Sequence, residues 1–207
     1  EGMQARASVE SMIVGEFAQM LSREGWLSGK VKCSVNIVRC QHYDHNTLYD
    51  LPVPPSPNLK SSTAVLLYPS LCLFEGTMVS VGRGTETPFE VWGAPVFKDN
   101  GFSFRPQSTE GAKSPLYENQ LCYGANLRLP PYDVLRIIRK KLNLTFIKNA
   151  YFLTPDKTKF FNDFFEKLTG TVSLRYHIMQ NKSEEEIRAS WQSGLTKFKS
   201  IRKKYLL

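Results

Sequence analysis

The sequence predicts an α+β fold with short mixed strands, several helices and two long ordered loops, and not a Rossmann fold by itself. Segments with helical periodicity and short segments with alternating apolar residues follow one another without the regular strand–helix–strand order of a parallel sheet. Of the 207 residues, 42% are hydrophobic and 22% are charged, as in ordinary globular proteins. No apolar run reaches the roughly 20 residues of a membrane-spanning helix, so we expect no membrane partner.

Several segments show the apolar spacing of helices. In the first, Ile13, Phe17 and Met20 fall on one face. In the last, Ser183 and Glu186 have the spacing of a capping box. The segments predicted as helices are residues 12–26, 61–74 (a short helix or a buried segment), 131–142, 160–168 and 183–204.

Other segments have the period of two that is typical of strands. Strict alternation of Val31, Cys33, Val35 and Ile37 predicts a strand over residues 31–38. Three further short strands are predicted at residues 89–97, 102–106 and 121–129.

The first long loop spans residues 41–60. Pro52, Pro54, Pro55 and Pro57 exclude a central strand and a helix interior from its second half. Loops of this length in compact domains are usually functional, and the prolines make this one stiff.

The second loop, residues 75–87, carries Gly76, Gly82 and Gly84 around Arg83. Glycine allows a positive φ and a close approach to a ligand, and an arginine held between glycines can present its planar fork to a carboxylate. The alternative is a tight turn whose Arg83 pairs with a glutamate of the same loop. The motif is neither a Walker loop nor a dinucleotide fingerprint, because its context is wrong for both.

Other types of site have weak support. The four cysteines include no C-x-x-C pair, so we expect free, buried thiols. His42 and His45 flank Asp44, but the segment offers no third strong ligand, so we predict no metal and no cofactor. No spacing of the acidic residues pairs two carboxylates as a glycoside hydrolase requires. The sequence also lacks the Gly-x-Ser-x-Gly nucleophile elbow of a serine hydrolase.

The charge of the chain is unevenly distributed. Residues 1–139 hold 13 basic and 13 acidic side chains, whereas residues 140–207 hold 14 and 6, so the whole excess of +8 lies in the last third. A solvated helix face explains such an excess. The sequence lacks an RNP-like strand, zinc-finger spacing and a basic glycine-rich arm, so we expect no nucleic-acid partner.

Both loops resemble signatures of the NamZ-type exo-β-N-acetylmuramidases, a family long known only as a domain of unknown function. Residues 43–58 (YDHNTLYDLPVPPSPN) are similar to its proline-rich loop, and residues 68–85 (YPSLCLFEGTMVSVGRGT) to its second signature. The similarity continues at residues 87–89 and 93–95 and at the end of the chain. It extends from about Ile13 onward.

The resemblance implies a two-domain protein of about twice this length. It implies that residues 1–207 are a single C-terminal domain, with residues 1–11 a possible linker remnant. The missing N-terminal domain, Rossmann-like and carrying the catalytic carboxylate, would then be its partner across the cleft. No catalytic residue is therefore expected in this chain, and we expect the chain alone to be inactive.

The resemblance also implies the reaction, which is hydrolysis of terminal N-acetylmuramic acid from the non-reducing end of peptidoglycan fragments, in the periplasm or outside a bacterial cell. Arg83 would bind the lactyl carboxylate, and Ser56, Asn58 and Thr85 would donate and accept hydrogen bonds. Glu75 would fix the loop rather than act as the acid. The competing hypothesis is a noncatalytic module that binds glycans or the cell wall.

Overall fold

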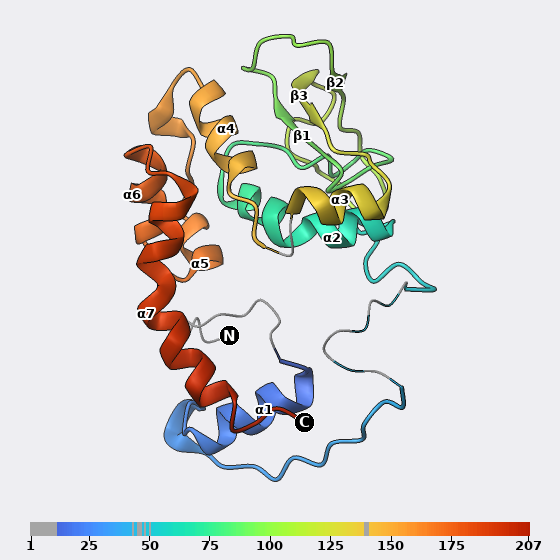
Figure 1. Ribbon diagram of the computed structural model, residues 1–207. Coiled ribbons are helices and arrows are strands. Elements are labelled where there is room, and N and C mark those ends of the chain that lie inside the picture. Colours follow the sequence, from blue (N-terminus) through green and yellow to red (C-terminus); the bar gives the residue numbers. More distant parts are fainter. Residues whose placement is uncertain (1–11, 43, 45–46, 48, 50, 139–140) are drawn as a thin grey trace. The chain divides into compact units, whose positions relative to one another are not determined.

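The computed structural model describes residues 12–207 except 43, 45–46, 48, 50 and 139–140 (Figure 1). The chain divides into two compact units. Among the described residues, the larger contains those within 51–184, and the smaller contains those within 12–49 and 185–207. The predicted α+β class is confirmed, because helices accompany a small antiparallel sheet.

A three-stranded sheet lies in the larger unit. Its strands are β1 (Val91–Ala94), β2 (Ser103–Phe104) and β3 (Cys122–Asn126), in the order β1-β3-β2. Both pairings are antiparallel, with Gly93 opposite Gly124. A Cβ on Gly124 would lie 1.9 Å from the Trp92 carbonyl oxygen, so this crossing requires glycine.

Helix α2 (Ser62–Leu71) precedes the sheet in the chain and continues as the 3-10 helix η2 (Cys72–Gly76). Ser61 caps α2 by accepting a hydrogen bond from the Ala64 N–H at 3.0 Å. The Ser61 hydroxyl also donates to the buried Glu90 carboxylate at 2.5 Å. The cap therefore fixes the start of α2 to the segment that leads into β1.

Aromatic side chains fill the core of the larger unit. Phe74, Phe89, Phe160 and Phe165 are fully buried. Trp92 of β1 stacks on Phe74 with 5.4 Å between ring centroids. Complete burial of each such side chain contributes about 1.5–3 kcal/mol to the stability of the fold. Since these rings belong to η2, the sheet region and the later helical segments, the core lies where these parts meet.

The other regular elements described in the larger unit are helices. They are α3 (Pro131–Ile138), α4 (Thr145–Leu153), η3 (Lys157–Lys159), α5 (Phe165–Thr169) and α6 (Ser173–Met179). Gly76 lets α5 approach η2, since a Cβ there would lie 2.5 Å from the Phe165 Cα. This approach holds the segment that carries Glu75 against the core.

The smaller unit contains α1 (Val14–Arg23), η1 (Ser28–Lys30) and all but the first residue of α7 (Glu184–Arg202). Fully buried Glu16 accepts hydrogen bonds from the backbone of Ile13 and Leu207. Glu24 accepts from the Tyr205 hydroxyl at 2.6 Å and from Lys204, and these bonds lower the pKa of Glu24. Side-chain carboxylates thus tie the end of the chain to α1.

Most predicted elements are present, with shifted ends. Three predicted helices correspond to α1, α2 and α7, a fourth corresponds to α3 over Pro131–Ile138, and the three later predicted strands contain β1, β2 and β3. None of the helices in the described ranges is long and apolar enough to cross a membrane.

The strand predicted over residues 31–38 is wrong. This segment pairs with no strand among the described residues and lies largely exposed. The Cys33 N–H donates to the Ser22 hydroxyl, and the Ile37 side chain lies where a Cβ on Gly15 would be, at 2.8 Å. The segment is therefore held beside α1 by these contacts instead of pairing in a sheet.

Three other expectations need correction. The helix predicted at 160–168 is confined to α5, because Phe160 and Phe161 belong to an aromatic cluster that includes Tyr151. Helices α4 and α6 were not predicted. All four cysteines are free, but Cys33 and Cys40 are exposed, because the segment that carries them is not part of a sheet.

Candidate functional site

The second loop, residues 75–87, is the glycine-rich loop of the site, and it contains a tight turn that requires Gly82 and Gly84. Gly82 has a φ of +74° and Gly84 a φ of +81°. A Cβ added to Gly82 would lie 2.4 Å from a methyl carbon of Val91. A Cβ added to Gly84 would lie 2.4 Å from the carbonyl oxygen of Gln107. The Thr85 hydroxyl donates to the Gly82 carbonyl at 2.6 Å. These contacts fix the positions of the side chains at 83 and 85.

Arg83 and Glu75 form an ion pair inside this loop. Arg83 Nε and Nη2 donate to the same Glu75 oxygen at 2.9 and 2.6 Å. The guanidinium carbon lies 5.0 Å from the centroid of the Phe89 ring. The Arg83 and Glu75 side chains are 36% and 26% exposed. Arg83 was expected either to bind a ligand carboxylate or to pair with a glutamate of its own loop. The structure shows the second contact, with Glu75.

Tyr68 completes this cluster. Its ring meets Phe89 edge to face, with centroids 5.0 Å apart. Burial raises the pKa of the Tyr68 hydroxyl, and the nearby Cys72 and Glu75 add to the shift. Tyr68 is therefore a neutral hydrogen-bonding group beside the ion pair at pH 7.

The proline-rich loop, within residues 41–60, is hydrogen-bonded to the turn at residues 109–112. The Asn58 side-chain amide donates to the Gly111 carbonyl oxygen at 2.7 Å. Its backbone N–H donates to the Ser56 hydroxyl, and Leu59 N–H to the Ser56 carbonyl. Gly111 permits the approach, since a Cβ there would lie 2.8 Å from Pro57 Cβ. Asn58, 8% exposed, thus joins segments 53 residues apart in the sequence.

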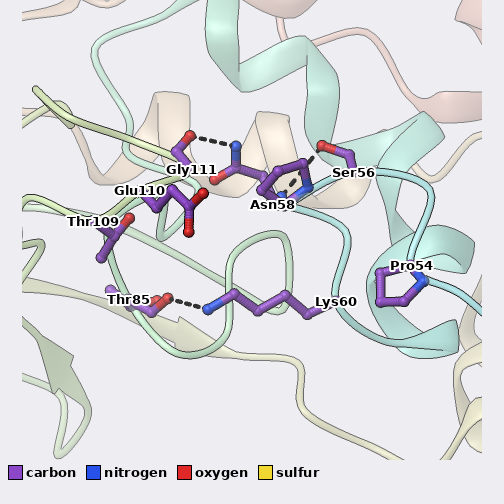
Figure 2. A pocket seen from close by; sticks show the side chains of 9 residues that line it. Pro54, Ser56, Asn58, Lys60, Thr85, Thr109, Glu110 and Gly111 are labelled. Carbon is purple, nitrogen blue, oxygen red and sulfur yellow. Dashed lines mark hydrogen bonds between the residues drawn. The ribbon is translucent and has the colours of Figure 1, made fainter.

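A hollow of about 460 Å³ opens where these loops meet (Figure 2). Its volume is within the usual range for small-molecule sites. The prolines form the apolar part of its surface, and hydroxyl, amide and charged side chains form the polar part. The lining residues are Pro54, Ser56, Pro57, Asn58, Lys60, Thr85, Thr109, Glu110 and Gly111.

Two charged side chains border the hollow. Lys60 Nζ donates to the Thr85 carbonyl oxygen at 3.4 Å and lies 4.0 Å from Glu86 Oε2. Figure 2 shows the Glu110 carboxylate directed toward the side where Lys60 and Thr85 lie. A positive and a negative group therefore border the same open space.

The structure brings together three of the five predicted site residues. Ser56, Asn58 and Thr85 line the hollow. Glu75 and Arg83 are not among its lining residues and contact each other. The expectation that the two loops meet on one surface is confirmed for residues 54–60 and Thr85.

Sequence reasoning missed part of the lining. Lys60 and Thr109 were not singled out, and Glu110 was considered only as one of several carboxylates without spacing to support it. Ser108, Thr109 and Gly111 form a cluster of loop-forming residues in the sequence, but the contact of this segment with the proline-rich loop depends on tertiary structure.

His42 and His45 were considered above as metal ligands, and no metal site was predicted there. His45 lies outside the described residues. Within the described part of the chain, no group of three or more His, Cys, Asp or Glu side chains could hold a metal ion.

Comparison with known proteins identifies relatives. Residues 66–207 match the family model "Exo-beta-N-acetylmuramidase NamZ, C-terminal", and residues 2–63 match "Exo-beta-N-acetylmuramidase NamZ, N-terminal". The chain is 32% identical over 213 aligned residues to the peptidoglycan β-N-acetylmuramidase NamZ of Bacillus subtilis. That alignment covers 95% of this chain and 50% of the relative. The family resemblance of the two loops is thereby confirmed.

Two solved structures from Bacteroides fragilis, both DUF1343 family proteins, are also similar. One is 42% identical with a TM-score of 0.88, and it is matched over 100% of this chain and 60% of its own. The other shares the fold at 18% identity and a TM-score of 0.60, over 93% of this chain and 55% of its own. The chain thus spans about half the length of the curated relative and 60% of the more similar structure.

Proposed function

The chain belongs to the NamZ exo-β-N-acetylmuramidase family of peptidoglycan glycosidases, and on this basis we propose that it binds substrate for a glycoside hydrolase. The proposed reaction releases terminal N-acetylmuramic acid from the non-reducing end of peptidoglycan fragments. The observation that carries the proposal is the hollow between the two loops. Its residues 54–60 fall in the match to the N-terminal model, and Thr85 and residues 109–111 in the match to the C-terminal model.

The lining suits a sugar. Sugar-binding surfaces need hydrogen-bonding groups held in fixed positions beside apolar walls. Asn58 and Thr85 have backbone partners that hold their side chains in place. Pro54 and Pro57 supply rigid apolar surface without backbone donors. We therefore assign substrate-binding roles to Ser56, Asn58 and Thr85.

Glu75 and Arg83 receive a different role. Their ion pair, stacked on Phe89, holds the turn that presents Thr85. Removing one partner would leave a partly buried charge without its counter-ion, which is costly. We therefore assign these two residues to the architecture of the site.

The reaction needs more than this hollow supplies. Glycosidases of the usual kind use two carboxyl groups on either side of the scissile bond. Among the described residues that line the hollow, Glu110 alone has a carboxylate. We propose that the catalytic carboxylate comes from another part of a longer protein, N-terminal to the segment in which this chain matches the two family models. The action on peptidoglycan implies a location in the periplasm or outside a bacterial cell.

The first prediction is that the 207-residue chain alone does not hydrolyse a chromogenic β-N-acetylmuramide above background. The reason is the single carboxylate at the hollow. The measurement is release of the chromophore by the pure chain, with a full-length family member as the positive control. Turnover by the chain near the rate of that control would contradict the division of roles.

The single carboxylate also favours a second candidate, a noncatalytic glycan-binding module. The two candidates differ when the chain is joined to the part of a relative that it does not cover. A fusion of this chain to the uncovered part of the 42% identical Bacteroides fragilis protein should gain muramidase activity if the chain belongs to an enzyme. A folded fusion that binds sugar without turnover would favour the module.

A further inference from the structure

We infer that Lys60 makes the hollow selective for a saccharide that carries a carboxylate, the lactyl group of N-acetylmuramic acid, over the same sugar without it. The inference rests on the proposed function and names the residue that recognises the anionic group. It assigns to Lys60 a role that the sequence motifs had suggested for Arg83.

The ammonium group of Lys60 is available to an incoming anion. Its bond to the Thr85 carbonyl is long, at 3.4 Å, and its distance to Glu86 is 4.0 Å. The Glu86 side chain is 98% exposed and the Lys60 side chain 43% exposed. Ion pairs in such exposed positions contribute little to stability, because water screens them. A ligand carboxylate can therefore replace Glu86 at little cost.

The backbone around Lys60 is nevertheless fixed. Lys60 directly precedes Ser61, which caps α2 and donates to the buried Glu90. Its stem starts from a fixed point beside the hollow, so ligand binding orders the side chain alone. The entropic cost of binding at this position is therefore limited to the rotamers of one lysine side chain.

Arg83 is a poorer candidate. Two of its N–H groups already donate to Glu75, and its guanidinium lies on the Phe89 ring. A carboxylate would have to displace Glu75 and leave that partly buried group unpaired. Of the described residues that line the hollow, Lys60 alone is cationic.

Glu110 cannot provide the same selectivity. A carboxylate accepts hydrogen bonds from the hydroxyl and acetamido groups that N-acetylmuramic acid and N-acetylglucosamine share. It repels the lactyl carboxylate that only the first sugar has. Discrimination in favour of the anionic sugar therefore depends on Lys60, and Glu110→Gln is a control at the same hollow.

The test measures the affinity of the 207-residue chain for N-acetylmuramic acid and for N-acetylglucosamine by calorimetry at low salt and pH 7. The unmodified chain should prefer N-acetylmuramic acid by about tenfold, which corresponds to about 1.4 kcal/mol. Lys60→Met should abolish the preference with little effect on N-acetylglucosamine. Lys60→Arg should keep it, and Glu110→Gln should not lower it. The preference should shrink as salt is added.

Each other outcome overturns the inference. Equal affinity of the unmodified chain for both sugars, or a preference that Lys60→Met retains, removes Lys60 from anion recognition but leaves saccharide binding intact. Absence of binding of either sugar contradicts the proposed function itself. If Lys60→Met loses the preference for N-acetylmuramic acid but circular dichroism shows that it is unfolded, Lys60→Arg decides. A folded Lys60→Arg variant that lacks this preference overturns the inference.

Discussion

Replacement of Gly84 by alanine is expected to cost about 2–5 kcal/mol of the free energy of unfolding, because it combines backbone strain with a steric clash. The φ of Gly84 is +81°, and a Cβ would lie 2.4 Å from the Gln107 carbonyl oxygen and 2.6 Å from the Pro115 ring. The Gln107 N–H donates to the Gly84 carbonyl at 2.8 Å, so the two segments cannot separate without losing this bond. The measurement is denaturant unfolding of the purified chain.

Gly101 offers a matched control for this prediction. Its φ is +90°, but a Cβ there would meet no atom within 4 Å. Gly101→Ala should therefore cost only the positive-φ strain, about 1–2 kcal/mol. Equal losses at the two positions would show that the close approach of Gly84 to Gln107 does not matter, and the geometry assigned to the turn would be wrong.

The second large effect is expected at the ion pair. Arg83→Lys keeps the charge but loses the planar fork that donates twice to Glu75. A charge-assisted hydrogen bond is worth about 1.5–3 kcal/mol, and partial exposure reduces this. We expect a loss of about 1–2 kcal/mol of unfolding free energy and equal weakening of binding for anionic and neutral sugars. Thermal unfolding and calorimetry measure the two effects.

A double-mutant cycle separates this role from direct anion binding. Glu75→Gln should destabilise the chain by a similar amount, and the double variant should lose less than the sum, because the residues act as a pair. Additive losses, or a selective loss of N-acetylmuramic acid binding in Arg83→Lys at unchanged stability, would contradict the architectural role and restore Arg83 as the carboxylate-binding residue.

The sequence predicted the parts of the fold that depend on local chemistry. The prolines at 52–57 and the glycines at 82 and 84 define loops whose backbone has few alternatives, and both loops are where the sequence placed them. The sequence also predicted helices where α1 and α7 lie. Helix α4 could also have been found, because its buried residues Phe146, Ile147, Ala150 and Tyr151 have helical spacing.

The parts that sequence reasoning missed depend on tertiary contacts. Alternation at residues 31–38 is the same whether the segment pairs with a strand or, as here, packs against Gly15 of α1. Nothing in the sequence relates residue 58 to residue 111, yet their hydrogen bond forms one wall of the hollow. The same limit applies to cations, since only the fold places Lys60 at the hollow and decides between the two roles that the sequence offered for Arg83.

The central claim is that the hollow between the proline-rich and glycine-rich loops binds the sugar. The most direct test is the change in backbone amide chemical shifts of the isotope-labelled chain as N-acetylmuramic acid is added. We expect saturable shifts at Ser56, Asn58, Thr85 and Gly111, with small changes at Gly101. Binding that shifts amides elsewhere while these four stay unmoved would contradict a sugar site in the hollow.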